Sequence, residues 1–98
     1  MDSSRDFEWD ETKRLSNIEK HGIDFADAIE AFADPAAYTF ASQGSANEQR
    51  YVTVGTTKGM LAPVISTLRG SVVRIISARA ARRSERQLYG GTKSQEEE

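Results

Sequence analysis

The hydrophobic period of this chain changes at Asp34-Pro35, and the change limits the folds that the chain can adopt. Before it, four apolar residues recur at i, i+3, i+4 and i+7, the spacing of a helix with one buried face: Phe25, Ala28, Ile29 and Phe32. After it, short segments alternate between apolar and polar residues, which is the period of strands. The sequence therefore predicts helices followed by a sheet, in an α+β fold.

The predicted elements follow one another in the order β-α-α-β-β-β-β-α. A first strand at residues 7–9 precedes a helix that begins after Asp10 and ends at Gly22. A second helix is capped by Asp24 and ended by Asp34, which precedes a proline. Strands are then expected at 38–41, 49–56, 60–67 and 72–78, and a last helix at about 81–89.

These elements predict an antiparallel sheet with one covered face. Consecutive strands joined by short turns pair as a meander, and the two helices form a hairpin that packs on one face. The first helix is expected to turn Leu15 and Ile18 toward its buried side, and the C-terminal helix follows the sheet. Pro63 cannot donate a hydrogen bond within its strand, so a bulge or a locally unpaired edge is expected there.

The composition is that of one small globular domain at residues 1–89, followed by a disordered acidic tail at 90–98. The 98-residue chain has no cysteine, which excludes disulfides and thiolate metal sites. It has no apolar run long enough to span a membrane, and it begins with an acidic segment where a signal peptide would be apolar. We therefore expect a cytoplasmic protein.

Charge is distributed unevenly along the chain, although the formal net charge is only −2. Residues 1–34 hold ten acidic and four basic side chains, whereas residues 69–86 hold six arginines and one acid, Glu85. The six arginines are Arg69, Arg74, Arg79, Arg82, Arg83 and Arg86. Such a local excess of positive charge indicates a surface that meets phosphates or carboxylates.

Three segments together carry a resemblance to a known family. They are FEWDETKRLSNIEKHGIDFADAIEAFADP, RYVTVGTTKGMLAPVISTLRG and VRIISARAARRSERQLY. Their order, with the motifs F-E-W-D, K-H-G-I-D-F, D-P and R-I-I-S-A-R before an arginine-rich helix, resembles the BrnT family of type II toxins. The resemblance covers residues 7–89. Leu68 stands where members often have an acid, so no catalytic acid is expected at that position, and Pro63 interrupts a strand that is usually aliphatic.

The resemblance implies a RelE-like domain that acts as an endoribonuclease. Members of the family cleave RNA without a metal or another cofactor and inhibit translation. A BrnA-like antitoxin with a ribbon-helix-helix DNA-binding part neutralises them. The pair represses its own operon, so operator DNA is contacted only through the antitoxin complex.

Cleavage of RNA without a metal needs a base for the 2′-OH, cations for the phosphorane and an acid for the leaving oxygen. Four arginines are the candidate cations because a guanidinium fork suits two phosphoryl oxygens. They are Arg50, Arg69, Arg74 and Arg79. Alternation within the last strand turns Arg74 away from Val73 and Ile75. Alternatively, some of these arginines pair with the acidic first third of the chain.

Three further residues are candidates for proton transfer or phosphate binding. His21 is the only histidine, and histidine gains and loses a proton near neutral pH; its position before Gly22 is equally typical of a helix end. Lys20 is either a phosphate clamp or a solvated surface residue. Glu48 is either the base or a solvated carboxylate at the edge of a loop.

The last helix carries candidates for binding. Arg82, Arg83 and Arg86 are expected to hold either the RNA backbone or an acidic antitoxin segment. Tyr89 either stacks on a base or closes the core at the helix end. Two other functions stay open on these residues: a catalytically degenerate toxin that binds only antitoxin and operator, and a nucleic-acid chaperone.

Overall fold

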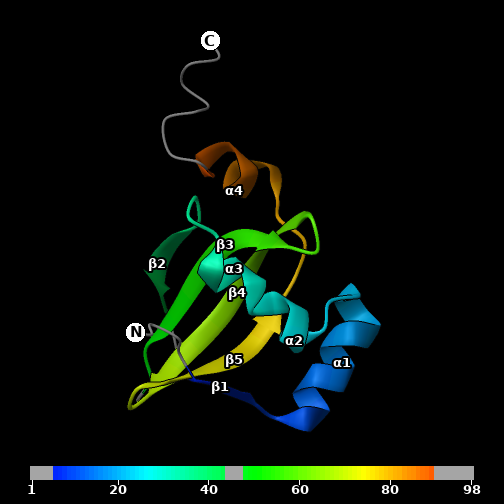
Figure 1. Cartoon of the computed structure of the whole chain (residues 1–98), viewed down its shortest axis with the longest axis vertical. Coiled ribbons are helices and arrows are strands. Elements are labelled where there is room, and N and C mark those ends of the chain that lie inside the picture. The colour runs from blue at the N-terminus through cyan, green and yellow to red at the C-terminus, as the bar shows by residue number, and fades with distance from the viewer. Residues whose placement is uncertain (1–5, 44–47, 90–98) are drawn as a thin grey trace.

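The computed structural model of the chain describes residues 6–43 and 48–89, so the tail predicted at 90–98 lies outside the described residues. The elements are β1 (Asp6–Trp9), α1 (Glu11–His21), α2 (Phe25–Ala28), α3 (Glu30–Ala33), β2 (Tyr38–Ser42), β3 (Arg50–Thr57), β4 (Met60–Arg69), β5 (Val72–Ala78) and α4 (Arg83–Leu88) (Figure 1). The predicted α+β class is confirmed. No helix in the described ranges is long and apolar enough to cross a membrane.

The sheet has five strands in the order β1-β5-β4-β3-β2. The four strands from β2 to β5 pair as an antiparallel meander, as predicted. β1 pairs with β5 in parallel, so the prediction of an antiparallel sheet is wrong at this edge and the sheet is mixed. No hairpin turn joins these two strands, because they come from opposite ends of the sequence, and nothing local requires them to run in opposite directions.

The predicted second helix is divided at Ile29 into α2 and α3. The backbone of Ile29 is still helical, but its carbonyl accepts from Phe32 N at 3.0 Å, a bond of the tighter 3₁₀ type. α2 and α3 cross one face of the sheet, while α1 lies beside the free edge of β5 (Figure 1). The predicted helical hairpin on one face is therefore wrong for α1.

The packing of α1 depends on a polar residue. Asn17 is buried, accepts from Ala78 N at 3.1 Å and donates to Ile23 O at 2.8 Å. It thus satisfies an edge N–H of β5 that β1 does not reach. Leu15 is 54% exposed, so its predicted burial is wrong, while Ile18 is half-buried.

The core lies between α2, α3 and the sheet. Phe25, Ala28 and Ala31 pack on strand residues that include Val64 and Ile75. The approach is close because β3 carries a glycine here. A Cβ on Gly55 would lie 2.7 Å from the carbonyl oxygen of Ala31, so a side chain would push α3 away from the sheet.

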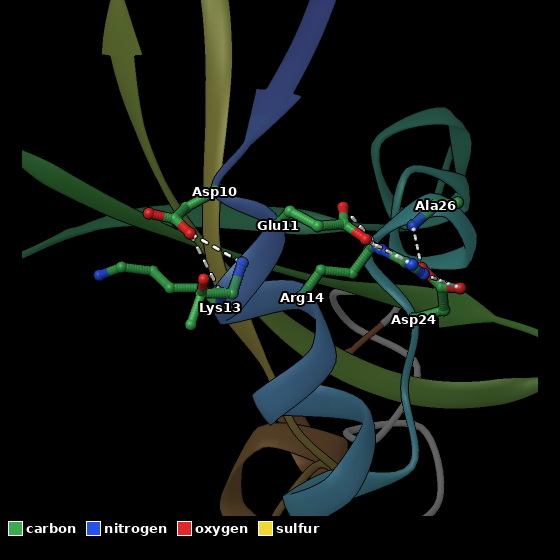
Figure 2. Close-up of polar contacts among 7 residues, drawn as sticks. Asp10, Glu11, Lys13, Arg14, Asp24 and Ala26 are labelled. Carbon is green, nitrogen blue, oxygen red and sulfur yellow. Dashed lines mark hydrogen bonds and ion pairs between the residues drawn. The ribbon is translucent and has the colours of Figure 1, made fainter.

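A cluster of ionic contacts joins α1 to the start of α2. Arg14 lies 2.7 Å from Glu11 and 2.9 Å from Asp24, and Asp24 caps α2 by accepting from Ala26 N (Figure 2). The bond from Ala26 N and the Arg14 guanidinium hold the pKa of Asp24 below its usual value. Asp10 caps α1 as predicted, accepting from the N–H groups of its first turn.

Pro63 occupies a regular position in β4, where it pairs with Val54. The irregularity in the β4–β5 ladder lies between Ile65 and Ser66, so the prediction of a bulge at Pro63 itself is wrong; the ladder ends at Val64, which confirms the alternative prediction of a locally unpaired edge at Pro63. Pro63 O accepts from Arg79 N at 3.2 Å, just after β5 ends. The missing N–H of the proline therefore falls where regular pairing with β5 has stopped.

Candidate active site

Four polar residues lie side by side on the face of the sheet opposite α2 and α3. Glu8 pairs with Arg74, Arg74 with Thr67, and Thr67 with Arg50, so one register level crosses β1, β5, β4 and β3. Paired residues in a sheet point to the same face. Their sequence neighbours Phe7, Trp9 and Ile75 pack into the core on the helix-covered face. We call Glu8, Arg74, Thr67 and Arg50 the arginine row.

The two arginines of this row have acidic neighbours at its ends. Arg74 Nη1 donates to Glu8 Oε2 at 2.9 Å, and Arg50 Nε lies 3.6 Å from Glu48 Oε2. Thr67 lies between them and is only 3% exposed, with its hydroxyl donating to Gln49 O. Arg50 Nε is buried and has no hydrogen-bond partner in the described part of the chain. The nearest acid, Glu48, balances its charge without making a hydrogen bond to it.

Arg69 lies near the row, at the end of β4. It is two residues beyond Thr67, about 7 Å along the strand, and it is exposed. Arg69 and Glu48 line one hollow of ≈260 Å³ between the start of β3 and the end of β4. The structure thus brings together Arg50, Arg69 and Arg74 with Glu48, four of the seven residues predicted to be catalytic.

Three residues of this face were not predicted as site residues. Only the pairing of the strands places Glu8 and Thr67 beside the arginines, so the sequence alone could not identify Thr67. The alternation of F-E-W does predict that Glu8 points away from the core. Phe40 on β2 is 44% exposed and pairs with Val52, so it shares the face of Arg50. Its ring stacks on Tyr38, with centroids 6.1 Å apart and planes at 21°.

Lys20 and His21 lie apart from the arginine row, at the end of α1. They line a hollow of ≈320 Å³ between α1 and β5, together with Thr12, Lys13, Ser16, Asn17, Ile76 and Ser77. Both side chains are exposed, and neither makes an ion pair within the described ranges. We refer to this feature as the α1–β5 hollow.

Arg79 lies at the other end of β5 and binds an acid of α4. Its guanidinium donates to both oxygens of Glu85, at 2.9 and 2.7 Å. Glu85 also accepts from Arg82 N at 2.8 Å. Chiefly through Arg79, these bonds lower the pKa of Glu85 to about 2. Arg79 lies opposite Pro63 of β4, and Arg74 lies opposite Thr67. Pro63 and Thr67 are four residues apart, so the backbones of the two arginines are separated by about 13 Å along the strand direction.

The other α4 candidates surround this ion pair. Arg82, Arg83 and Arg86 are exposed, with Arg82 preceding the helix instead of lying inside it. Tyr89 donates to Asp34 Oδ2 at 2.6 Å, and the same oxygen accepts from Thr56 N and Oγ1. The Tyr89 hydroxyl, followed by the N–H groups of Ala36 and Thr56 and the Thr56 hydroxyl, holds the pKa of Asp34 below its usual value. Base stacking by Tyr89 stays a prediction.

A larger hollow of ≈390 Å³ lies beside α3, on the helix-covered face of the sheet, opposite the arginine row. Its lining includes Phe32, Tyr51 and Leu68, and its one charged residue is Asp34. An acidic group without a cation does not suit a phosphate. Within residues 6–43 and 48–89, no three His, Asp or Glu side chains are grouped as metal ligands.

A family model described as "Ribonuclease toxin, BrnT, of type II toxin-antitoxin system" matches residues 9–85. A comparison with curated proteins finds no match. The matched range includes Arg50, Arg69 and Arg74 and extends from the end of β1 into α4. Since the model matches more than half of the sequence, the chain belongs to the BrnT family of ribonuclease toxins.

Proposed function

We propose that the protein is an endoribonuclease toxin that cuts RNA at the arginine row without a metal. The observation that carries the proposal is the alignment of Arg74 and Arg50 on either side of Thr67. Their Cα atoms are two strand spacings apart, about 10 Å. Two long guanidinium side chains on one face can converge on a single phosphate at this separation, and their charges oppose the negative charge of the phosphorane.

The acids at the two ends of the row provide for proton transfer. In the proposed reaction the 2′-oxygen attacks the adjacent phosphorus and loses its proton to the carboxylate at one end of the row. The P–O5′ bond breaks, and the 5′-oxygen takes a proton from the acid at the other end, which must carry that proton when substrate binds. Glu8 lies beside Arg74 and Glu48 beside Arg50, so one acid flanks each side of the phosphate. The products are a 2′,3′-cyclic phosphate and a 5′-hydroxyl.

Phe40 supports an RNA substrate in preference to a free phosphate. An exposed aromatic ring beside cations is the usual combination for binding single-stranded RNA, in which unstacked bases lie on aromatic faces. Phe40 is two residues along β2 from Ser42, the partner of Arg50. A base next to the cut phosphate can therefore reach this ring.

Family membership supports the remaining features of the proposal. A type II toxin has an antitoxin partner, and we propose a BrnA-like ribbon-helix-helix protein that binds the exposed arginines of α4 and covers the arginine row. RNA cleavage by the free toxin would then inhibit translation in the cytoplasm. We also propose that residues 1–89 form one RelE-like domain, and that operator DNA is bound only by the complex.

Incubation of the purified protein with single-stranded RNA in excess EDTA tests the proposal. We expect fragments with 2′,3′-cyclic phosphate ends, and no cleavage once the antitoxin is added. Cleavage that requires added divalent metal would contradict the metal-free reaction. Intact RNA together with tight antitoxin binding would identify a degenerate toxin that acts only as a binding module.

A further inference from the structure

The α1–β5 hollow has a charge composition that sets it apart from the rest of the chain. The protein has 15 acidic residues, yet none of those within residues 6–43 and 48–89 lines this hollow. Two lysines, one histidine, three hydroxyls, one amide and one aliphatic side chain do: Lys13, Lys20, His21, Thr12, Ser16, Ser77, Asn17 and Ile76. Cations with hydroxyl donors and no acid form a surface that suits an anion.

The two lysines lie in line along one side of α1. Lys13 and Lys20 are seven residues apart, which is two helical turns or about 10 Å, with Ser16 and Asn17 between them. The Glu11–Arg14–Asp24 contacts lie on the other side of the helix from the Lys13 side chain, whereas the Asp10 carboxylate lies on the Lys13 side and accepts from the backbone N–H groups of Thr12 and Lys13 (Figure 2). The spacing is too wide for one small anion and suits a chain of phosphates.

The hollow lies next to the arginine row along β5. Ile76 and Ser77 form its β5 side, and Arg74 is two residues before Ile76, about 7 Å along the strand. On the other side, β1 ends at Trp9 beside Ile75, and α1 begins two residues later. RNA bound at Arg74 and extending along β5 would therefore reach the surface hollow where α1 meets β5.

We propose that the α1–β5 hollow binds the phosphodiester backbone of the RNA that flanks the cut. This inference rests on the proposed ribonuclease function and adds a binding track to it. Lys13 and Lys20 supply charge-assisted contacts to successive parts of the backbone, and the hydroxyls of Thr12, Ser16 and Ser77 are neutral donors. His21 belongs to this track. The contacts recognise phosphate and not base, so they add affinity without sequence preference.

The salt dependence of RNA binding tests the track without requiring cleavage. Lys13→Gln and Lys20→Gln remove one charge each while keeping the helix propensity of lysine. The affinity of each variant for a single strand of about ten nucleotides is measured over a range of salt concentrations. Each substitution should reduce the slope of log affinity against log salt by about 0.7. Lys58→Gln, at the exposed turn between β3 and β4, is the matched control and should keep the wild-type slope.

Substrate length separates a binding track from a catalytic role. A dinucleotide bound at the arginine row is too short to reach the α1–β5 hollow, whereas the longer strand occupies the row and the hollow together. The ratio of kcat/KM for the longer strand over the dinucleotide should fall about three- to fivefold in each lysine variant. An equal loss on both substrates would assign the lysine to the chemistry and overturn the track.

The remaining outcomes distinguish this inference from the proposed function. If RNA is bound and cut but both lysine variants keep the wild-type slope and length ratio, the track is wrong and the ribonuclease stands. If wild-type protein binds no RNA, both fail together. If the variants lose affinity for poly-glutamate and not for RNA, the hollow is a site for an acidic protein, which also overturns the proposal.

Discussion

The arginine row and the α4 end, by which we mean Arg79 just after β5 together with α4 and Arg82 before it, both contain arginines but use them differently. At the α4 end, Arg79 makes two bonds to Glu85, and Glu85 makes a third to the backbone of Arg82. In the row, Arg74 makes one bond to a half-exposed Glu8, and Arg50 Nε has no hydrogen-bond partner among the described residues. Both carboxylate oxygens of Glu85 are therefore occupied. Arg74, in contrast, uses one of the five N–H groups of its guanidinium in a side-chain hydrogen bond within the described residues.

The contrast teaches that the density of arginines in a sequence is a poor guide to their role. A bidentate pair with a half-buried carboxylate is a structural contact, because separating it leaves charge without a partner. A pair that is open on one side can exchange its carboxylate for a phosphate at small cost. We therefore infer that Arg79 positions α4, and that Arg50 and Arg74 are the arginines that meet substrate.

The largest effect that separates the two regions is expected for Arg74→Ala. Removal of one preorganised donor to a transition state lowers kcat by about 10²- to 10³-fold, whereas loss of one exposed ion pair changes the free energy of unfolding by less than about 1 kcal/mol. Single-turnover cleavage of RNA and urea denaturation measure the two quantities. Unchanged cleavage by this variant would remove the row as the active site.

Arg79→Ala should have the reverse profile. Glu85 loses both side-chain donors, so we expect a loss of about 1–3 kcal/mol in the stability of α4 docking, seen as faster hydrogen exchange of the α4 amides. Arg79→Lys, which restores one donor and the charge, should recover part of it. A variant with native α4 protection and no cleavage would instead return Arg79 to the catalytic group predicted from the sequence.

The sequence predicts the elements of this fold better than their arrangement. The bounds of β5 and both Asp caps of α1 and α2 follow from local rules of alternation and capping. The parallel β1–β5 pair does not, because it joins segments about 65 residues apart and no turn residue specifies its direction. Asn17 is a similar case: its burial depends on an unpaired N–H of Ala78, which exists only after the sheet has formed.

The same limit applies to the candidate site. The chemistry of guanidinium groups singles out Arg50 and Arg74 as candidates, but the alignment of Glu8, Arg74, Thr67 and Arg50 is a property of the register. The pairing of Arg79 with Glu85 spans only six residues, yet a sequence gives no sign of whether such a pair closes or stays open. Local spacing identifies candidates, and tertiary contacts decide which of them are free to bind.

A pH titration should affect the α4 end through Glu85. The pKa of this carboxyl is about 2 in the folded protein against an ordinary value of 4.5, so its ionised form stabilises α4 fully above about pH 4.5. That stability is lost as pH falls toward 2. We expect a loss of about 1–2 kcal/mol in α4 protection over this window, measured by hydrogen exchange. Glu85→Gln should lack this component, and identical pH profiles for both proteins would contradict the assignment.

The smallest effect is expected for Arg83→Gln, which tests whether the exposed arginines of α4 belong to either region. Arg83 makes no ion pair within the described ranges and is exposed at the first turn of α4. Its replacement should change the free energy of unfolding by less than about 0.5 kcal/mol. If α4 binds an acidic antitoxin segment, antitoxin affinity measured by calorimetry should fall severalfold while RNA cleavage by the free toxin is unchanged. An equal fall in RNA cleavage would extend the substrate surface from the arginine row onto α4 and remove the division between the two ends of the sheet.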